Sequence, residues 1–366
     1  MTLNEITLNN FKNIRSAQLQ LSPKINCFLG DNGMGKSNLL DAIYFLSFCK
    51  SFTGAQDPML IARDEDFAMI QARYTRNDAR EELSAALRRG RPKSFKRSGK
   101  EYRRLSQHIG LFPLVLSSPA DMDLVAGAPD ERRRFLDMLI SQTDARYLDA
   151  LIRYNQALEQ RNRLLRDQVS DPNLYLALET MLDASARIIA ASRAENLRRL
   201  TAIFEQYYAA ISGGNEKPSL TYVSHLSDPS VSLIDILDLR RARDAALRYT
   251  SAGVHRDDIE MLLDGLPVRR SASQGQQKSF AVALRLAQYD FLHRASGIAP
   301  LLLLDDIFDK LDAARVSNIM DIVSRNDFGQ IFITDTNRKH LDEVMQAASA
   351  APFALWTVDH GSFTLL

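Results

Sequence analysis

The sequence predicts an α/β protein whose parallel sheet is built from both ends of the chain, with a helical lobe inserted between them. Three observations predict this class. The apolar run 25–29 leads directly into a glycine-rich loop and then a helix, which is the strand, loop and helix order of an α/β unit. A second apolar run, 300–304, ends in two carboxylates, as a central parallel strand does at its carboxyl end. Between these runs, residues 130–211 have an almost purely helical pattern.

Composition limits the possible functions. The chain has 366 residues, with 46 Lys and Arg against 45 Asp and Glu, so no global field draws it to nucleic acid or anionic lipid and any basic surface must be local. Its two cysteines, Cys27 and Cys49, form no C-x-x-C pair, which favours a reducing cytoplasm. The N-terminal residues lack the pattern of a signal peptide, and the longest apolar stretch, 298–304, is too short to span a bilayer. We expect a cytoplasmic protein with no membrane partner.

The N-terminal region predicts strands that lead into a phosphate-binding loop. Residues 3–29 alternate as half-buried strands, and the runs 67–74 and 82–87 predict an antiparallel piece attached to the same sheet. The last strand before the loop enters a match to G-x-x-x-x-G-K-[ST], in which glycines let backbone N–H groups point at phosphates ahead of a helix N-terminus. The residues expected to bind ATP are Gly30, Asp31, Asn32, Gly33, Met34, Gly35, Lys36, Ser37 and Asn38. Within this set we expect Lys36 to contact the β- and γ-phosphates and Ser37 to bind Mg²⁺.

Two basic clusters are candidates for contact with DNA. Residues 88–104 hold nine Lys and Arg, one acid, and the rings Phe95 and Tyr102, and we predict a hairpin around Ser98-Gly99. Its cations either keep an exposed sheet edge from aggregating or contact a phosphate backbone. The sequence does not decide between these interpretations, nor between this segment and the cluster Arg132-Arg133-Arg134.

The middle of the chain predicts helices. Acids precede cations at 130–136, with Asp130 expected as the cap. Pro172 separates this segment from 174–211, which has no Gly or Pro and ends at Gly213-Gly214. Because no heptad register is sustained, a small packed lobe is favoured over an extended coiled coil. Residues 215–246 are mixed in pattern, with a hinge expected at Asp228-Pro229.

The second half of the ATP site follows the run 300–304. Asp305-Asp306 completes a Walker B pattern, in which we expect Asp305 to hold Mg²⁺ with Ser37 and Asp306 to orient or deprotonate the attacking water. Downstream, Asp312 stands at the D-loop position of ATP-binding-cassette (ABC) ATPases. The strand 330–334 ends without the switch histidine of transporter ATPases. The segments 353–358 and 363–366 predict a closing hairpin.

A signature-like motif lies upstream of this strand. Ser273-Gln274-Gly275-Gln276 precedes a helix, and in isolation it would be an N-cap with a glycine turn. In a P-loop protein it matches the S-x-G-Q signature of ABC ATPases. Such a signature lies too far from its own P-loop to bind the same nucleotide, so we expect Ser273, Gly275 and Gln276 to cap ATP held by a second subunit.

The motifs together resemble the RecF family, bacterial recombination-mediator ATPases related to the heads of SMC proteins. The resemblance rests on the segments 8–13, 30–42, 127–137, 253–258 and 273–278. It implies an SMC-like ABC-type ATPase head that forms a homodimer with ATP and binds duplex DNA at single-strand gaps and junctions. It also implies that the protein works with RecR and RecO to load RecA in recombinational repair, replication restart and the SOS response, and that weak DNA-stimulated hydrolysis releases it.

Three positions depart from the family pattern. Ala120 stands where an acid is common, although Asp121 is adjacent; Val254 replaces a common proline; and Asp306 stands where many cassette ATPases have glutamate. The shorter Asp306 side chain indicates slow turnover. After Val254, the pair His255-Arg256 either packs a loop against a sheet or contacts nucleotide or DNA.

Two other functions fit the sequence less well. A transporter ATPase subunit would keep its signature roughly a hundred residues from the P-loop and would show a switch histidine, and a small-molecule P-loop kinase would have no use for the signature. We expect three segments: an ATPase lobe with Walker A at 1–116, an inserted helical lobe at 117–245, and the rest of the ATPase lobe at 246–366.

Overall fold

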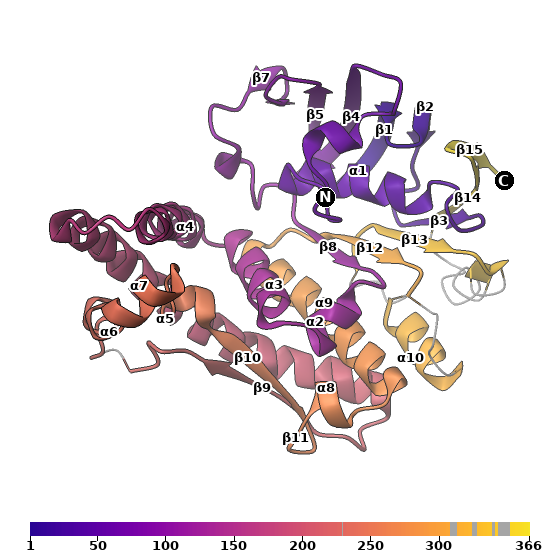
Figure 1. Ribbon diagram of the computed structural model, residues 1–366. Helices are drawn as coiled ribbons and strands as arrows, with labels where there is room; N and C mark the ends of the chain where they lie inside the picture. Colours follow the sequence, from indigo (N-terminus) through magenta and orange to yellow (C-terminus); the bar gives the residue numbers. More distant parts are fainter. Residues whose placement is uncertain (229, 308–312, 324–327, 339–340, 343–351) are drawn as a thin grey trace. The chain divides into compact units, whose positions relative to one another are not determined.

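The computed structural model describes residues 1–366 except 229, 308–312, 324–327, 339–340 and 343–351 (Figure 1). It divides into two compact units. Unit 1 contains residues 1–121, 210–213 and 274–366, and unit 2 contains residues 122–209 and 214–273. The expected boundary at 246 therefore moves to 273. The reason is that β10 (Asp258–Leu263) pairs antiparallel with β9 (Pro218–Val223), which keeps 246–273 in unit 2.

The first sheet of unit 1 is the predicted one, with strands from both ends of the chain. Its order is β15-β14-β3-β13-β12-β8. The parallel strands are β3 (Ile25–Leu29), β8 (Leu114–Ser117), β12 (Leu301–Asp305), β13 (Ile331–Asp335) and β14 (Phe353–Asp359). The closing hairpin is confirmed, because β15 (Ser362–Leu365) pairs antiparallel with β14.

Helices from distant parts of the sequence belong to the same unit. Helix α1 (Lys36–Phe48) follows β3 and contacts β8, β12 and β13, and α9 (Gln274–Ser296) contacts β8. The third is α10 (Ala313–Val323). Strand β12 is buried along its whole length and α1 over most of its surface. Such near-continuous apolar burial is what a central parallel strand with a packed helix requires.

A second, antiparallel sheet completes unit 1, in the order β2-β1-β4-β5-β6-β7. Its strands are β1 (Thr2–Phe11), β2 (Ile14–Gln20), β4 (Phe67–Arg76), β5 (Ala79–Arg88), β6 (Ser94–Arg97) and β7 (Lys100–Glu101), with the short helices η1 (Asp57–Leu60) and η2 (Leu105–Gln107) nearby in sequence. The hairpin around Ser98-Gly99 is confirmed. The antiparallel piece, however, does not extend the parallel sheet; it pairs with β1 instead.

Unit 2 is largely helical, as predicted. Its helices are α2 (Asp121–Ala126), α3 (Pro129–Ser141), α4 (Ala145–Arg166), α5 (Pro172–Ser212), α6 (Leu233–Leu239), α7 (Arg241–Leu247), η3 (Val254–Arg256) and α8 (Val268–Ser271), of which α2 and α5 each reach into unit 1 at one end. Helix α5 runs unbroken for 41 residues. A small sheet of β9, β10 and β11 (Leu266–Pro267) packs with them, and α3 contacts β10.

Three local predictions have different outcomes. Asp130 is not the cap of α3: Ala128 holds that position with Pro129 at the first turn, and Asp130 lies within the turn, where its charge still favours the helix dipole. The hinge expected at Asp228-Pro229 falls partly outside the described residues, because residue 229 is not among them. Among the helices that are described, none is both long and apolar enough to cross a membrane.

Candidate nucleotide-binding site

The glycine-rich loop after β3 has the curled backbone that phosphate binding requires. Gly33 and Gly35 have φ of 81° and 116°, a region that side chains rarely adopt. At Gly30, an added Cβ would lie 2.4 Å from the carbonyl oxygen of Val358. Lys36 opens α1, and its ammonium donates to the carbonyl oxygens of Gly30 at 2.6 Å and Asp31 at 3.0 Å. The cation thus lies across the loop, beside the N-terminus of α1.

The structure brings Ser37 and Asp305 together from positions 268 residues apart. The Ser37 hydroxyl donates to Oδ1 of Asp305 at 3.0 Å, and the Thr334 hydroxyl donates to the same oxygen at 2.6 Å. Burial raises the pKa of Asp305, against the hydrogen bonds from Thr334 and Ser37 and the nearby charges of Lys36 and Lys278. A divalent cation would supply the missing positive charge to this carboxylate.

The donor set fits Mg²⁺ held jointly with phosphates. In the described part of the chain, no group of three or more His, Cys, Asp and Glu gathers to hold a metal by itself. Mg²⁺ is usually bound by one or two carboxylates together with substrate phosphates and water. The oxygens of Ser37 and Asp305 at the mouth of the phosphate loop suit that mode of binding.

Asp306 has an unusual backbone. Its φ is 45°, in the left-handed region that a non-glycine residue adopts at a cost of about 1 kcal/mol or more. Its N–H donates to the carbonyl oxygen of Thr334 at 3.2 Å, which holds this conformation. Burial and the neighbouring charge of Asp305 raise the pKa of the half-buried Asp306. Strain and a perturbed carboxyl together are typical of functional positions.

Thr334 and Asn13 belong to the site although no sequence pattern pointed to them. The amide of Asn13 donates to the carbonyl oxygen of Gly33 at 3.4 Å, and its oxygen accepts from Asn38 at 2.7 Å. The N–H of Gly361 donates to the carbonyl oxygen of Met34 at 2.7 Å. The β1–β2 turn and the C-terminal hairpin therefore brace the loop from both sides. The available signal was an Asn and a Thr at element ends, which is too common to single them out.

The signature motif lies at the start of α9. Ser273 immediately precedes the helix, and Gly275 and Gln276 lie in its first turn. The helix thus begins inside the motif and not after it. Asp312 and the D-loop around it lie outside the described residues. Whether the signature faces a nucleotide on a second copy stays a prediction.

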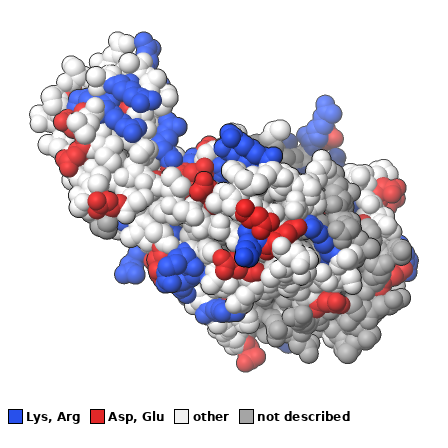
Figure 2. Space-filling model, turned by 90° about the horizontal axis from the view of Figure 1, so that it is seen from below, with Lys and Arg blue, Asp and Glu red and all other residues white. Residues whose placement is uncertain are grey.

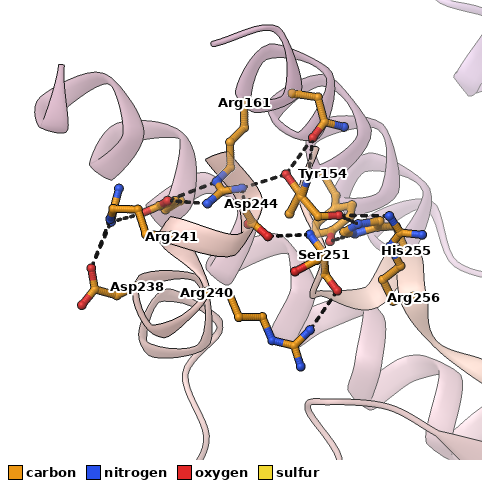
Figure 3. A network of polar contacts seen from close by, with 12 residues as sticks. Tyr154, Arg161, Asp238, Arg240, Arg241, Asp244, Ser251, His255 and Arg256 are labelled. Carbon is orange, nitrogen blue, oxygen red and sulfur yellow. Dashed lines mark hydrogen bonds and ion pairs between the residues drawn. The ribbon is translucent and has the colours of Figure 1, made fainter. Parts of the chain in front are cut away.

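His255 and Arg256 belong to a network inside unit 2 (Figure 3). Nδ1 of His255 accepts from the Tyr154 hydroxyl at 2.7 Å, and Nε2 donates to the carbonyl oxygen of Thr250 at 3.0 Å. Burial lowers the pKa of His255 to about 4. Arg256 donates to the same carbonyl at 3.2 Å. These contacts support the interpretation that the pair packs a loop.

The network centres on a fully buried arginine. Arg161 pairs with Asp244 at 2.8 Å and with Glu179 at 3.0 Å, and it donates to Thr250 at 2.9 Å. Arg241 reaches Glu179 from the outside at 3.2 Å. Since one side chain joins α4, α5, α7 and the loop before η3, these contacts fix the end of the helical unit.

Arginines 132, 133 and 134 are also committed within unit 2. Arg132 is buried and pairs with Asp258 at 2.6 Å, Arg133 donates to the carbonyl oxygen of Asp257 at 2.6 Å, and Arg134 pairs with Glu131 at 3.1 Å. On the face seen in Figure 2, Lys and Arg lie interspersed with Asp and Glu. Of the two basic clusters, residues 88–104 are therefore the better candidate for an external anion.

Known proteins of one structural class resemble this chain over nearly its whole length. The family model described as RecF/RecN/SMC N terminal domain matches residues 2–353. The Smc head domain of Pyrococcus furiosus superposes with a TM-score of 0.59 at 17% identity, covering 100% of this chain and 96% of that chain, which is a likeness of fold. The fold is that of a P-loop ATPase head of the SMC type.

Closer relatives narrow the class to one family. The DNA replication and repair protein RecF of Parabacteroides distasonis is 50% identical over 361 residues, covering 99% of this chain and 98% of the relative. That of Porphyromonas gingivalis strain W83 is 45% identical over 363 residues, covering 99% of both. A solved structure, the recombination mediator protein RecF-ATP in the RecFOR pathway, has a TM-score of 0.89 at 28% identity, covering 100% of this chain and 97% of that chain. The chain belongs to the RecF family, as its motifs predicted.

Proposed function

We propose that this protein is an ATP-dependent DNA-binding protein of replication and repair, in which ATP binding and hydrolysis act as a switch. The observation that carries the proposal is the 3.0 Å contact between Ser37 and Asp305, which joins the two halves of an ATP site. The relatives named as DNA replication and repair proteins and the related structure containing ATP support it. The transporter and kinase alternatives find no support in these comparisons.

The residues of the site would have separate roles in binding and hydrolysing ATP. The loop from Gly30 to Asn38 would hold the phosphates, with Lys36 at the β- and γ-phosphates. Ser37 and Asp305 would hold Mg²⁺, which would neutralise charge on those phosphates. Asp306 would orient or deprotonate the attacking water. Its short side chain and strained backbone suit a weak, DNA-stimulated ATPase.

The signature gives the switch its second component. In this proposal Ser273, Gly275 and Gln276 cap ATP bound to a second copy, so that two copies close around two nucleotides and clamp DNA near gaps or junctions. Asp312 would lie at the same interface. RecR and RecO are the proposed partners, acting in the cytoplasm to help load RecA, and the RecFOR pathway named for the solved relative supports this.

The test is the molar mass in solution with Mg²⁺ and ATP. The variant Asp306→Asn blocks hydrolysis, and each measurement is made with and without a gapped duplex. We expect a dimer that requires ATP and that disappears in Asp306→Asn combined with Ser273→Arg, because the long cation blocks the signature. Ser273→Ala in the same background is the control, since it removes the hydroxyl without adding bulk.

Two results would contradict the proposal. A monomer under every condition would show that the signature is only a helix N-terminus in this chain. A dimer that persists in Ser273→Arg would show that the copies associate through another surface.

A further inference from the structure

The basic hairpin, defined as residues 88–104, contains two kinds of cation. Three have partners within unit 1: the exposed Arg89 donates to the carbonyl oxygen of Glu65 at 2.9 Å, Lys93 pairs with Asp57 at 3.0 Å, and Arg97 pairs with Glu81. The other six are exposed, as Arg89 is, and they form no ion pair with any residue that the structure describes. They are Arg88, Arg91, Lys96, Lys100, Arg103 and Arg104. The one acid of the segment, Glu101, accepts from Ser94 at 2.6 Å.

The rings of the hairpin point inward. Phe95 is 1% exposed, and its ring centroid lies 4.7 Å from that of His108. The Tyr102 hydroxyl donates to Nδ1 of His108 at 3.0 Å. Phe95 is therefore not available to stack on a base, and Tyr102 is half-buried against His108. Besides Arg89, the exposed charges of the hairpin are six cations against the single acid Glu101. That chemistry recognises a phosphate backbone without reading sequence.

Two internal groups connect the hairpin to α1. Nε2 of His108 donates to the carbonyl oxygen of Leu46 at 2.7 Å, and the ammonium of Lys93 donates to the carbonyl oxygen of Cys49 at 2.7 Å. Both acceptors lie in or just after the last turn of α1, where carbonyl groups lack a partner within the helix. The Lys93 ammonium also lies 5.3 Å from the centroid of the Phe45 ring on the same helix.

Helix α1 begins at Lys36 and Ser37 in the phosphate loop. Its 13 residues extend about 20 Å, so the loop and the hairpin contacts lie at opposite ends of one rigid element. A displacement of the hairpin would thus move the C-terminal end of α1, and the helix would carry that movement to its N-terminal end, which holds the phosphate-binding residues. All the residues in this connection between the hairpin and the phosphate loop belong to unit 1.

We propose that the basic hairpin binds the phosphate backbone of duplex DNA, and that His108 and Lys93 transmit this contact through α1 to the ATP site. The inference rests on the proposed function and adds to it the contacting segment and the route of DNA stimulation. His108 and Lys93 are positioning residues here, because neither touches the nucleotide. The competing interpretation is an edge hairpin whose cations only prevent aggregation.

The first experiment tests the contact. A variant with Lys96→Ala, Lys100→Ala, Arg103→Ala and Arg104→Ala is compared with one that removes four exposed arginines of unit 2 by Arg146→Ala, Arg163→Ala, Arg166→Ala and Arg243→Ala. Duplex affinity is measured over a range of salt concentrations. We expect the hairpin variant to bind roughly tenfold or more weaker, with a salt slope lower by about 3 to 4, and the unit 2 variant to change less. Unchanged affinity and slope in the hairpin variant would overturn the proposal.

The second experiment tests the transmission. We expect His108→Phe, which keeps a ring but loses both hydrogen bonds, to retain duplex affinity and DNA-free ATP hydrolysis while losing DNA stimulation. Lys93→Met is an independent variant should His108→Phe fail to fold. The control is Tyr74→Phe, because Tyr74 packs 4.8 Å from Phe112 in the same ring cluster and its buried hydroxyl has no hydrogen-bond partner among the described residues.

Full stimulation in Lys93→Met or His108→Phe, with duplex binding intact, would overturn the transmission. The proposed function fails separately, and in a different measurement: it fails if the unaltered protein neither binds duplex DNA nor hydrolyses ATP faster in its presence. If the unaltered protein does both and the hairpin variants match it, only this inference is wrong.

Discussion

Some side chains at the ATP site suit a bound ligand but lower the stability of the protein when no ligand is bound. Asp305 is a buried carboxylate that accepts two hydroxyl hydrogen bonds but pairs with no cation at hydrogen-bond distance among the described contacts. Burying a charge without a partner costs free energy of folding. The site therefore holds negative charge that binding of Mg²⁺ would stabilise.

This leads to a prediction for Asp305→Asn. Without nucleotide, we expect the variant to be at least as stable as the unaltered protein, because a neutral amide is cheaper to bury. We then add Mg²⁺ and ATP at a hundred times the dissociation constant of the unaltered protein. Its free energy of unfolding should rise by about 2.7 kcal/mol, and that of the variant should hardly change. Thermal unfolding by calorimetry measures both.

Asp359→Asn is the control, since Asp359 is an exposed carboxylate at the end of β14 in the same sheet. An equal gain in Asp305→Asn and Asp359→Asn would contradict the assignment of Asp305 as a Mg²⁺ ligand.

Among the elements, α1 is held more firmly than its packing alone requires. The carboxylate of Asp41 is wholly buried and accepts from the Lys12 ammonium at 2.6 Å, the Ser51 hydroxyl at 2.7 Å and the Phe52 N–H at 2.8 Å. It joins α1 to the β1–β2 turn and to the segment after the helix. These contacts fix the helix that connects the phosphate loop to the basic hairpin.

We expect Asp41→Ala to lower the free energy of unfolding by about 3 kcal/mol, because it leaves the largely buried Lys12 without its carboxylate and the Phe52 N–H without its acceptor. Urea unfolding followed by circular dichroism measures the change. Asp130→Ala, which removes an exposed carboxylate from the first turn of α3, should cost less than 1 kcal/mol. A small effect at Asp41 would contradict this prediction, because it would mean that the Lys12 ammonium and the Phe52 N–H bind water or other partners.

The elements also show what local sequence can predict. Strands β3 and β12, the phosphate loop and the long helix α5 follow from apolar runs, glycine spacing and the lack of helix breakers, all of which are local signals. The partner of β4 did not follow, because pairing with β1 joins residues more than fifty positions apart. Arg132 looked like a surface cation, yet its partner Asp258 lies 126 residues away. The contact between Thr334 and Asp305 likewise could not be predicted, because the two residues are 29 positions apart in the sequence.

At the scale of the whole molecule, each unit contains a neutral histidine set between a tyrosine hydroxyl and a backbone carbonyl. In unit 1, burial lowers the pKa of His108 to about 4, and in unit 2 it lowers the pKa of His255 to about 4. In both, the ring donates from Nε2 and accepts at Nδ1, so added protonation would place a donor against a hydroxyl already donating. Both units should therefore weaken under mild acid.

The prediction is sharpest for His108, which is fully buried. Because its folded-state pKa lies below the unfolded value of about 6.5, the unfolded chain takes up the proton first as the pH falls. Stability is then complete above pH 6.5 and is lost progressively toward pH 4, with a loss of about 1 kcal/mol at pH 5.5. Unfolding measured between pH 5 and 8 should show a shallower slope in His108→Phe than in His360→Phe, the exposed control. Parallel slopes would contradict the prediction.

The strand order of the parallel sheet has a consequence for synthesis. Strand β3 and the phosphate loop leave the ribosome early, but the strands that flank β3 are β13 and β14, and the carboxylate that faces Ser37 comes from β12. A nascent chain that stops before residue 301 therefore has no neighbours for β3 and no second half of its nucleotide site. The helical unit, by contrast, is complete once residue 273 has been made. ATP binding therefore depends on strands that are translated late, and messages truncated before codon 301 would yield products that lack half of the nucleotide site.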